Sequence, residues 1–515
     1  MGKKAKWDIY LQAIRESDEA ILGGAFVYGY DNDTAVTSGS NQFKKVVLNQ
    51  DNASYTYPAN GFTQMPCHGK VRPCVMSDCA NRTVAYYLNP YDISKKVDGT
   101  ASTLTGADGD VMVEFEPCYY RIDQYTDGNS HLHEVFLMSV DSFPGAAYWP
   151  GFYISNGGAT LRKQYVGMYQ GYITGGKLHS WSGVQPTVST SCANFINAGV
   201  ANGGNQVNDL MFQWIFHLMI TELASCDSQT AVSRGHVDMS GSWQASWVRK
   251  TGRADSVPYK GGVLADDADV DSDLVSSWAS GAAHVIACKY AYIENLWGSV
   301  WENCAGYQKY QDGTEIDITV NSVKYYRYED GDYPSGEGVT RTAFAWKSEG
   351  GTVIYTAAAH PSVNNATYSD TALETSTGYT ISAFDEDFTQ SGYWFTTDTA
   401  KYSQLTSNRD PGPENSAFPA AGCTPDSIAW VSHNWPKAEG WPSKWDARTL
   451  FPTNASGGAA GTGLTDYFYN NVQGGARALF RGGSAYPGSK AGFGCVNVNG
   501  TVGYSVTYIG GRLSA

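Results

Sequence analysis

The chain has 515 residues, with 35 Lys and Arg against 50 Asp and Glu, which gives a formal net charge of −15. Nucleic-acid-binding proteins carry a basic patch or stripe, and no basic run of any length occurs here, so we expect no nucleic-acid partner. No segment approaches the roughly 20 apolar residues that a membrane span needs, so we expect no membrane insertion. The start, MGKKAKWDIYLQ, has no apolar stretch after its basic residues, which predicts synthesis in a cytoplasm without a secretion signal.

Gly and aromatic residues take the place of the missing charges. Charged residues amount to 17%, whereas the chain has 57 Gly, 35 Tyr, 19 Phe and 15 Trp. This mixture favours short strands, many turns and wide loops, and it predicts an α+β fold with few helices. Tyr and Trp also supply contact area at low entropic cost, so surfaces rich in them often bind other molecules. A large β-rich core accounts for most of these aromatic residues equally well.

The first hundred residues have the pattern of a separate β-rich region. Short extended runs occur at 25–30, 44–49 and 83–89, and a polar stretch of turn residues, DGTASTLTGADGD, follows at 98–110. We therefore predict that residues 1–105 form a separate, β-rich N-terminal region. Residues 106–515 are predicted to form a second domain that folds without it.

The second part begins with strands and continues with two helices. Residues 111–123 alternate, with Val111, Val113 and Phe115 on one side, and 133–140 and 151–155 are further strand candidates. Helices are predicted within 187–204, which starts with Ser/Thr caps, and within 208–225, which Asn208 or Asp209 can cap. The apolar residues of the second helix surround it, so we expect it to be largely buried.

Strand candidates at 322–331, 350–359 and 377–384 follow, and they lie in a predicted loop-rich and strand-rich insertion at about 309–420. The last 50 residues are rich in Gly. Within them NVNGTV predicts a hairpin with Asn499 and Gly500 at its turn.

The stretch YIENLWGSVWENCAGYQ, residues 292–308, raises a structural question. Trp297 and Trp301 are four residues apart, which suits one face of a helix, but Gly298 between them costs a helix about 1 kcal/mol relative to Ala. A tight turn in the core explains the pattern better. Both indoles are then buried, Gly298 lets the backbone turn, and Glu302 accepts hydrogen bonds from backbone donors.

Several separated motifs resemble one protein family. LWGSVWENCAG is similar to the GNVWEW motif of the formylglycine-generating/sulfatase-modifying superfamily, a branch of the C-type lectin fold, and LFRGGSAYPGSKAGFGCVNVNG…IGGRL resembles its closing element. YVGMYQG, LHSWSGVQPTVSTSCANFINAGVANGG and FHLMITELASCDSQTAVSRG resemble the version found in bacteriophage tail and prophage proteins. The resemblance spans about 108–515 and implies a C-type-lectin-like domain. The residues it implies for the structural core are Trp297, Gly298, Trp301, Glu302, Arg481, Gly482, Gly483 and Arg512.

The resemblance also implies a function. The protein would be a phage virion protein of a tail fibre, a tail tip or a head fibre, and its C-terminal face would bind a host surface protein or glycan. The N-terminal region would attach to other virion proteins or serve oligomerisation. The virion protein would be a homo-oligomer, with a trimer favoured by analogy.

In relatives diversified by retroelements, the closing region carries the variable ligand-binding positions. It has four Lys or Arg and no acidic residue between 470 and 515, a local reversal of the chain's charge. The implied ligand-binding residues are Ser484, Tyr486, Ser489, Lys490, Asn497, Asn499, Thr501 and Tyr504. A plain solvated hairpin is the alternative.

Catalytic patterns are weak. The sulfatase-modifying enzymes need a pair of cysteines near the end of the closing element, and only Cys495 stands there, so we expect no enzymatic activity. No GxSxG, HExxH or Walker A stretch occurs. Two alternatives stay open: an enzyme of the same superfamily acting on a host glycan or peptide, and a purely structural virion decoration protein.

We expect no metal and no cofactor, although a structural calcium stays open. Three groups contain candidate metal ligands, but each lacks the number or spacing of ligands that a metal site needs. The remaining cysteines are interpreted as free buried thiols. The three groups are Cys67, His68, Cys74 and Cys79; His131, His133 and Glu134; and Asp267, Asp269, Asp271 and Asp273.

Overall fold

A computed structural model describes residues 25–33, 35–36, 42–144, 146–154, 160–265, 277–281, 284–312, 466–470, 475–497 and 504–515, with the backbone of short strands between 322 and 454. The fold is α+β, as predicted. Four α-helices and many strands in several sheets make up these described parts. The turn Asn499-Gly500 and the four aspartates at 267–273 lie outside the described residues, as does most of the predicted insertion at 309–420.

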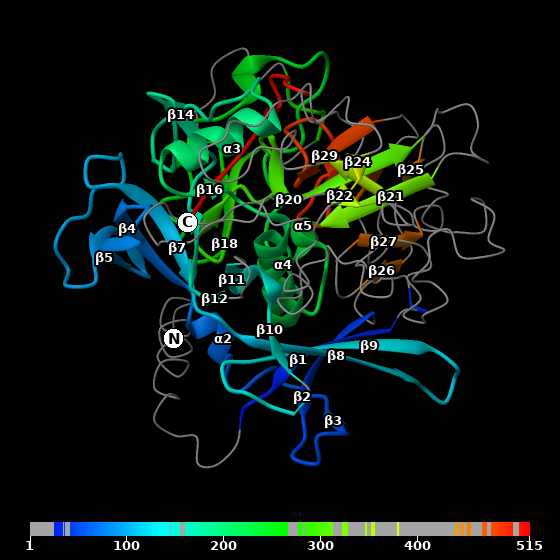
Figure 1. Cartoon of the computed structure of the whole chain (residues 1–515). Coiled ribbons are helices and arrows are strands. Elements are labelled where there is room, and N and C mark those ends of the chain that lie inside the picture. Colours follow the sequence, from blue (N-terminus) through cyan, green and yellow to red (C-terminus); the bar gives the residue numbers. More distant parts are fainter. Residues whose placement is uncertain are drawn as a thin grey trace.

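The lower sheet in Figure 1 has six antiparallel strands in the order β10-β8-β9-β1-β2-β3. Its strands are β1 (Tyr28–Asp33), β2 (Phe43–Leu48), β3 (Tyr55–Thr56), β8 (Tyr119–Thr126), β9 (Leu132–Ser139) and β10 (Ala147–Tyr148). One face packs against the central helix α4. The opposite face carries a smaller apolar cluster that includes Val46, Val135 and Leu137.

A second sheet has seven strands in the order β16-β32-β13-β7-β4-β5-β6. The helix α2 (Pro66–Gly69) precedes its strand β4. Val111, Val113 and Phe115 of β7 all join the main core, as the alternation predicted, while Met112 packs into a second cluster on the other side. The strands are β4 (Arg72–Asp78), β5 (Thr83–Asn89), β6 (Asp92–Lys96), β7 (Asp110–Phe115), β13 (Gln164–Gly167), β16 (Asn205–Gln206) and β32 (Leu513–Ser514).

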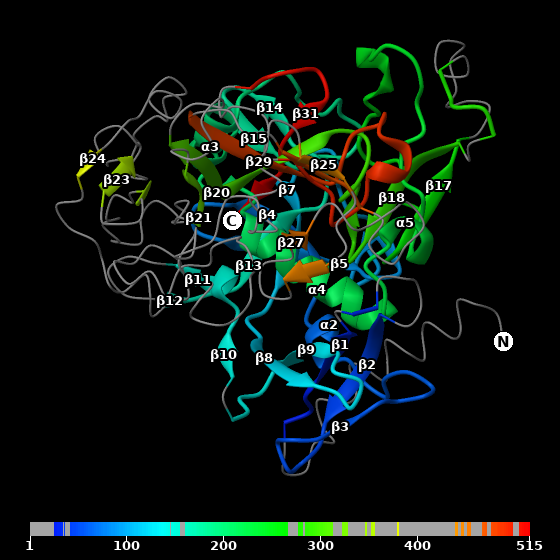
Figure 2. The same ribbon diagram turned by 90° about the vertical axis from the view of Figure 1, so that its right-hand side faces the viewer.

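A third sheet has the order β21-β20-β29-β30-β28-β25, and β31 adds to β20 in parallel. A three-stranded sheet of β17 (Gly261–Leu264), β18 (Val285–Tyr290) and β19 (Ile293–Glu294) lies beside it in Figure 2. The strands of the third sheet are β20 (Trp301–Asp312), β21 (Ser322–Arg327), β25 (Ala438–Gly440), β28 (Phe468–Asn470), β29 (Gly475–Arg481), β30 (Val496–Asn497) and β31 (Ile509–Gly510).

The remaining strands form small separate ribbons. They are β11 (Tyr153–Ile154) with β12 (Thr160–Leu161), β14 (Tyr172–Thr174) with β15 (Lys177–His179), β22 (Trp346–Lys347) with β23 (Thr352–Tyr355) and β24 (Tyr379–Thr380), and β26 (Lys444–Asp446) with β27 (Phe451–Asn454).

The two predicted helices are confirmed together with their caps. Helix α3 (Cys192–Ala201) begins after Ser191, whose side chain accepts a hydrogen bond from the backbone of Asn194. Helix α4 (Asp209–Leu223) begins after Asn208, whose side chain accepts from Met211. Such caps satisfy backbone N–H groups that a helix leaves unpaired. A short helix, α5 (Ser228–Ala231), follows. As expected, α4 is buried almost all round, and it fills the space between the lower sheet and the rest of the core (Figure 1).

The boundary predicted near residue 105 is not present in the fold. Strand β1 pairs with β9 over six residues, and β4 pairs with β7 over five, so two sheets each join strands from before residue 105 to strands from after it. One core cluster runs from Tyr28 to Ile509. The stretch 98–110 is therefore a surface loop between strands of one sheet, and its turn-forming composition does not mark a domain linker.

The Trp-Gly motif forms a tight turn, as its composition predicted. Trp297 is fully buried and its indole N–H donates to the carbonyl of Ser233 at 3.0 Å. Gly298 has φ of +77°, and a Cβ there would lie 2.7 Å from the carbonyl oxygen of His236, so only Gly fits. Trp301 differs from expectation: it begins β20 and is only partly buried against the core.

Glu302 also differs from expectation, because its partner is a side chain and not the backbone. It forms a buried ion pair with Arg512, whose Nε lies 2.9 Å from Glu302 Oε2 and whose Nη2 contacts Oε1. Both side chains are buried, with at most 1% of their surface exposed. Arg512 uses its other donors on the carbonyls of Gly167 at 2.9 Å and Glu294 at 2.8 Å. One guanidinium thus joins β13, β19 and β20.

Replacing Arg512 by Met should destabilise the protein by about 3–5 kcal/mol, because Glu302 then remains buried without its counter-charge. Chemical denaturation measures this. The double variant Glu302→Leu with Arg512→Met should recover part of the loss, since it removes the unpaired charge. Lys250→Met, at an exposed position, is the control and should change stability by no more than about 0.5 kcal/mol. Equal stability of Arg512→Met and the control would contradict this role.

Residues 106–515 expressed alone should not fold, contrary to the expectation from the sequence. The fragment lacks β1 and β4, so β9 and β7 each lose a paired neighbour and the core loses the apolar residues before position 105. Soluble yield and a thermal melt, compared with the full chain, measure this. A soluble fragment with a cooperative melt would restore the boundary near residue 105.

Candidate functional site

The loop of residues 484–490 is held by backbone hydrogen bonds on both sides. Ala485 donates to the carbonyl of Ser299 at 3.0 Å and accepts from Met239 at 2.9 Å. Gly488 donates to the carbonyl of Val237 at 2.9 Å. Ala485 is itself buried in a small cluster with Trp247 and Trp278. The loop therefore keeps a fixed position on the surface, directly above the Trp297–Gly298 turn.

The side chains of this loop divide between core and surface. Tyr486 is 55% exposed, and Ser489 and Lys490 are also exposed. The Lys490 ammonium lies 4.4 Å from the centre of the Tyr467 ring. Ser484 is 4% exposed, so it does not contribute to the surface as the sequence implied.

Tyr486 is one end of a continuous row of aromatic rings. It stacks on Trp247 with ring centres 6.2 Å apart, and Trp247 contacts Trp243 at 5.1 Å. Trp243 contacts Tyr508 at 5.3 Å, and the hydroxyl of Tyr508 lies 2.8 Å from that of Tyr504. Tyr504 is 37% exposed. We call these five residues the aromatic row; it connects two of the residues that the sequence implied for binding.

Sequence reasoning missed the middle of this row. Trp243 and Trp247 lie in SGSWQASWVRK, and Ser242, Gln244, Ala245 and Ser246 around them are exposed. Two tryptophans among small polar residues are a signal that could have been noticed. What the sequence could not reveal is that they lie against a loop some 240 residues later in the chain.

His236 contacts the backbone of Trp247, which is a member of the aromatic row. It is fully buried, with Nε2 2.7 Å from the carbonyl oxygen of Trp247 and Nδ1 3.1 Å from that of Val285. Burial lowers the pKa of His236 to about 4, although both carbonyls oppose this by favouring the charged ring. The ring is therefore neutral near pH 7, and only one of its two nitrogens donates a hydrogen bond.

The other implied binding residues are only partly described. Asn497 is half-buried in β30, beside the fully buried Val496. Asn499 and Thr501 lie outside the described residues.

The local excess of basic residues is not a surface property in the described part. Arg481 and Arg512 are both fully buried, and Arg481 Nε contacts Asp209 Oδ1 at 2.7 Å. Gly482 and Gly483 follow Arg481 with positive φ of +86° and +78°, and they turn the chain out of the core into the loop. Of the basic side chains described between 470 and 515, Lys490 is the exposed one.

The candidate metal ligands that the structure describes have other partners. His133 Nδ1 lies 2.8 Å from Asp31 Oδ1 and His131 Nδ1 lies 3.1 Å from Asp33 Oδ2, while Glu134 is buried on the same strand. His68 contacts the hydroxyl of Tyr28 and the carbonyl of Leu218, each at 2.9 Å. Among the described residues, no group of three or more His, Cys, Asp or Glu side chains is arranged to hold a metal ion.

The cysteines of the described ranges are buried and free, as predicted, and they include Cys67, Cys74, Cys79 and Cys495. Burial raises the pKa of the Cys495 thiol well above its usual value, and its sulfur lies 3.2 Å from the carbonyl oxygen of Tyr467. A neutral, enclosed thiol of this kind is a poor nucleophile.

No known family model matches the chain, and no curated protein matches it either. Within the described ranges, none of the helices has the length and apolar character needed to cross a bilayer.

Acid should destabilise the protein through His236. Its pKa is about 4 when folded and 6.5 in an unperturbed ring, so the unfolded chain binds the proton more tightly. The stability present above pH 6.5 is then lost as the pH falls toward 4, by about 3 kcal/mol. Denaturation curves at pH 7 and pH 4 measure this. His236→Gln should lose about 3 kcal/mol less between these values than the wild type; identical losses would contradict the assignment.

Proposed function

We propose that this protein is a bacteriophage or prophage virion protein that binds a host-cell receptor through loop 484–490 and the aromatic row. In this proposal the chain carries a C-type-lectin-like domain of the sulfatase-modifying type, and the host partner is a surface protein or a glycan. The observation that carries the proposal is the surface itself: a fixed loop displays Tyr486 and Lys490 at one end of five contacting aromatic rings.

The packing of the resembling motifs supports the proposed fold. The Trp-Gly turn lies more than 180 residues before the Arg-Gly-Gly stretch and the final Arg, yet the three motifs meet at one place. Gly298 donates to the carbonyl of Gly482 at 3.1 Å, and Glu302 lies opposite Arg481 in the sheet while pairing with Arg512. A common fold requires that its motifs pack together in one core, and these motifs do.

The composition of the surface supports binding to another molecule. Tyr and Trp give large rigid contact areas, and residues of this type dominate the binding energy at many interfaces. Trp247 is buried beneath Tyr486, so the exposed ring is backed by a second ring and loses little freedom on binding. Lys490 and Ser489 add polar contacts at the rim.

The enclosed thiol of Cys495 favours this proposal over a sulfatase-modifying activity, because that chemistry needs accessible cysteines. In the proposal the protein is part of the virion as a homo-oligomer, with a trimer favoured by analogy. In this proposal other virion proteins attach through residues 1–105, whose described strands share one core with the rest of the chain.

Tyr486→Ala should reduce adsorption of the purified protein to host cells at least tenfold, which corresponds to about 1.4 kcal/mol. Thermal stability should change little, because the ring is largely exposed. Adsorption to cells beside a melting curve measures both. Leu264→Ala, at an exposed residue of β17, is the control and should adsorb as the wild type does. Full adsorption by Tyr486→Ala would leave a structural decoration role as the better explanation.

A further inference from the structure

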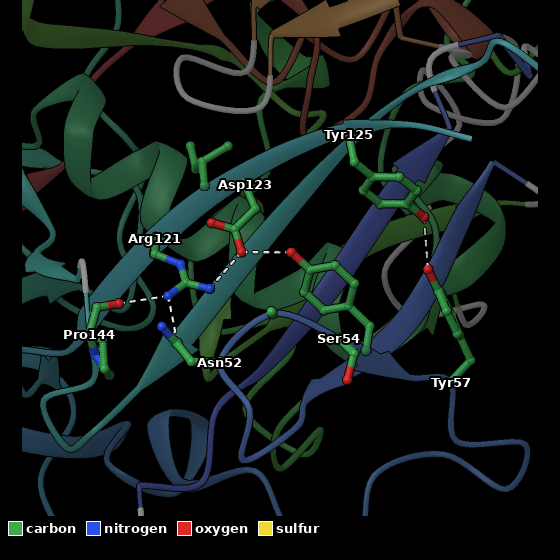
Figure 3. Close-up of a pocket in the computed structure, with 10 residues that line it drawn as sticks. Asn52, Ser54, Tyr57, Arg121, Asp123, Tyr125 and Pro144 are labelled. Atoms are coloured by element: carbon green, nitrogen blue, oxygen red, sulfur yellow. Dashed lines mark hydrogen bonds and ion pairs between the residues drawn. The ribbon is translucent and has the colours of Figure 1, made fainter. Parts of the chain in front are cut away.

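A groove of about 940 Å³ opens on the lower sheet, at the end of the molecule away from β29 and the loop that follows it (Figures 1 and 2). It lies between β8 and the turn that joins β2 to β3. Its volume falls in the range of clefts that hold small molecules. The side chains that line it are chiefly Asn52, Tyr55, Tyr57, Arg121, Asp123 and Tyr125. Figure 3 labels all of these except Tyr55.

The polar side of the groove is fixed before any ligand arrives. Arg121 donates to Asn52 Oδ1 at 2.8 Å, to the carbonyl of Pro144 at 2.6 Å and to Asp123 Oδ2 at 2.7 Å. The hydroxyl of Tyr55 donates to the same Asp123 oxygen at 2.7 Å. In Figure 3 the second carboxylate oxygen of Asp123 makes no bond to the other residues drawn. A carboxylate held this way can accept from a ligand without losing further freedom.

The local sequence explains the position of Asn52. Its φ is +56°, a left-handed conformation that Asn tolerates better than most residues. The preceding Asp51 accepts from the backbone of Ala53 at 3.0 Å and of Ser54 at 2.9 Å, which closes the turn. The Asn52 amide is thereby placed over the sheet, where it meets Arg121.

The other side of the groove is made of tyrosine rings. Tyr57 is 44% exposed, and its hydroxyl donates to Asp31 Oδ2 at 2.7 Å and lies 3.0 Å from that of Tyr125. The rings of Tyr55 and Tyr125 stack with centres 6.1 Å apart. Because their hydroxyls are bonded, these rings present fixed faces, and Tyr57 presents the most accessible one.

We infer that this groove binds an uncharged saccharide. Arg121 and Asp123 neutralise each other, so neither a free anion nor a free cation gains a net attraction there. A pyranose ring offers a C–H face that packs on an aromatic ring, and neighbouring hydroxyls that both donate and accept. The groove supplies an aromatic face in Tyr57, an acceptor in Asp123 and an amide in Asn52. This second site is independent of loop 484–490 and does not rest on the proposed function.

Ligand-observed saturation-transfer NMR on the full chain tests this inference, with lactose, maltose and N,N′-diacetylchitobiose as probes and sialyllactose as the charged comparison. At least one neutral saccharide should give a signal, and sialyllactose should bind no better than lactose. Tyr57→Ala should weaken that binding at least tenfold, and Asp123→Asn should weaken it as well. A melting curve for each variant confirms folding.

Leu264→Ala, at a residue that is 65% exposed and lies outside both the groove and the aromatic row, is the control and should keep the full saccharide signal. The host-adsorption test depends on Tyr486 and the saccharide test depends on Tyr57, so failure of one test leaves the other intact. The inference is overturned if none of the neutral saccharides gives a signal. It is also overturned if the signal survives in Tyr57→Ala, whose exposed position leaves the fold intact.

Discussion

The ion pair between Glu302 and Arg512 is the contact on which the arrangement of the sheets depends. Arg512 stands between β31, which pairs with β20 in the third sheet, and β32, which pairs with β13 and β16 in the second. Its guanidinium reaches Glu302 in one sheet and the Gly167 carbonyl in the other. A buried charge needs both a counter-charge and saturated hydrogen bonds. Meeting that need fixes how the two sheets lie against each other.

Contacts in the same region hold the surface loop 484–490 in a fixed position against the core. Gly298 and Gly482 meet through a backbone hydrogen bond, and the chain leaves this point through Gly483 into loop 484–490. His236 contributes on both sides, since its carbonyl accepts from Ser299 while its ring contacts the carbonyl of Trp247. The position of the aromatic row is therefore set by core contacts. In many binding proteins the binding residues lie on loops that a rigid scaffold holds in position.

Local patterns were readable from the sequence, and long-range pairing was not. The caps at Ser191 and Asn208, the alternation in β7 and the Gly298 turn follow from short-range geometry, and each is found. The separation at residue 105 failed because turn residues look alike in a loop and in a linker, whereas strand pairing across them has no local signal. The burial of Arg481 and Arg512 is a related case, because the carboxylates that pair with them, Asp209 and Glu302, are distant in the chain.

The candidate surfaces divide in the same way. Tyr486 and Lys490 could be selected because they follow a motif that turns the chain outward. Trp243, Trp247 and Tyr508 could not be joined to them, since the contact exists only after three distant segments pack. The groove on the lower sheet is harder still, because Tyr55 and Asp123 are 68 residues apart and share a hydrogen bond that no spacing rule predicts.

The placement of β32 has a consequence for how the chain is made. It lies between β16 and β13, yet the ribosome produces it over 300 residues after β13, as the 345-residue separation of Arg512 and Gly167 illustrates. Until then β13 has a bare edge of unpaired backbone groups. Such edges recruit strands from other chains, and late closure of distant pairs is slow. Strand exchange, in which β32 of a second copy pairs with this edge, therefore competes with self-closure while the chain folds.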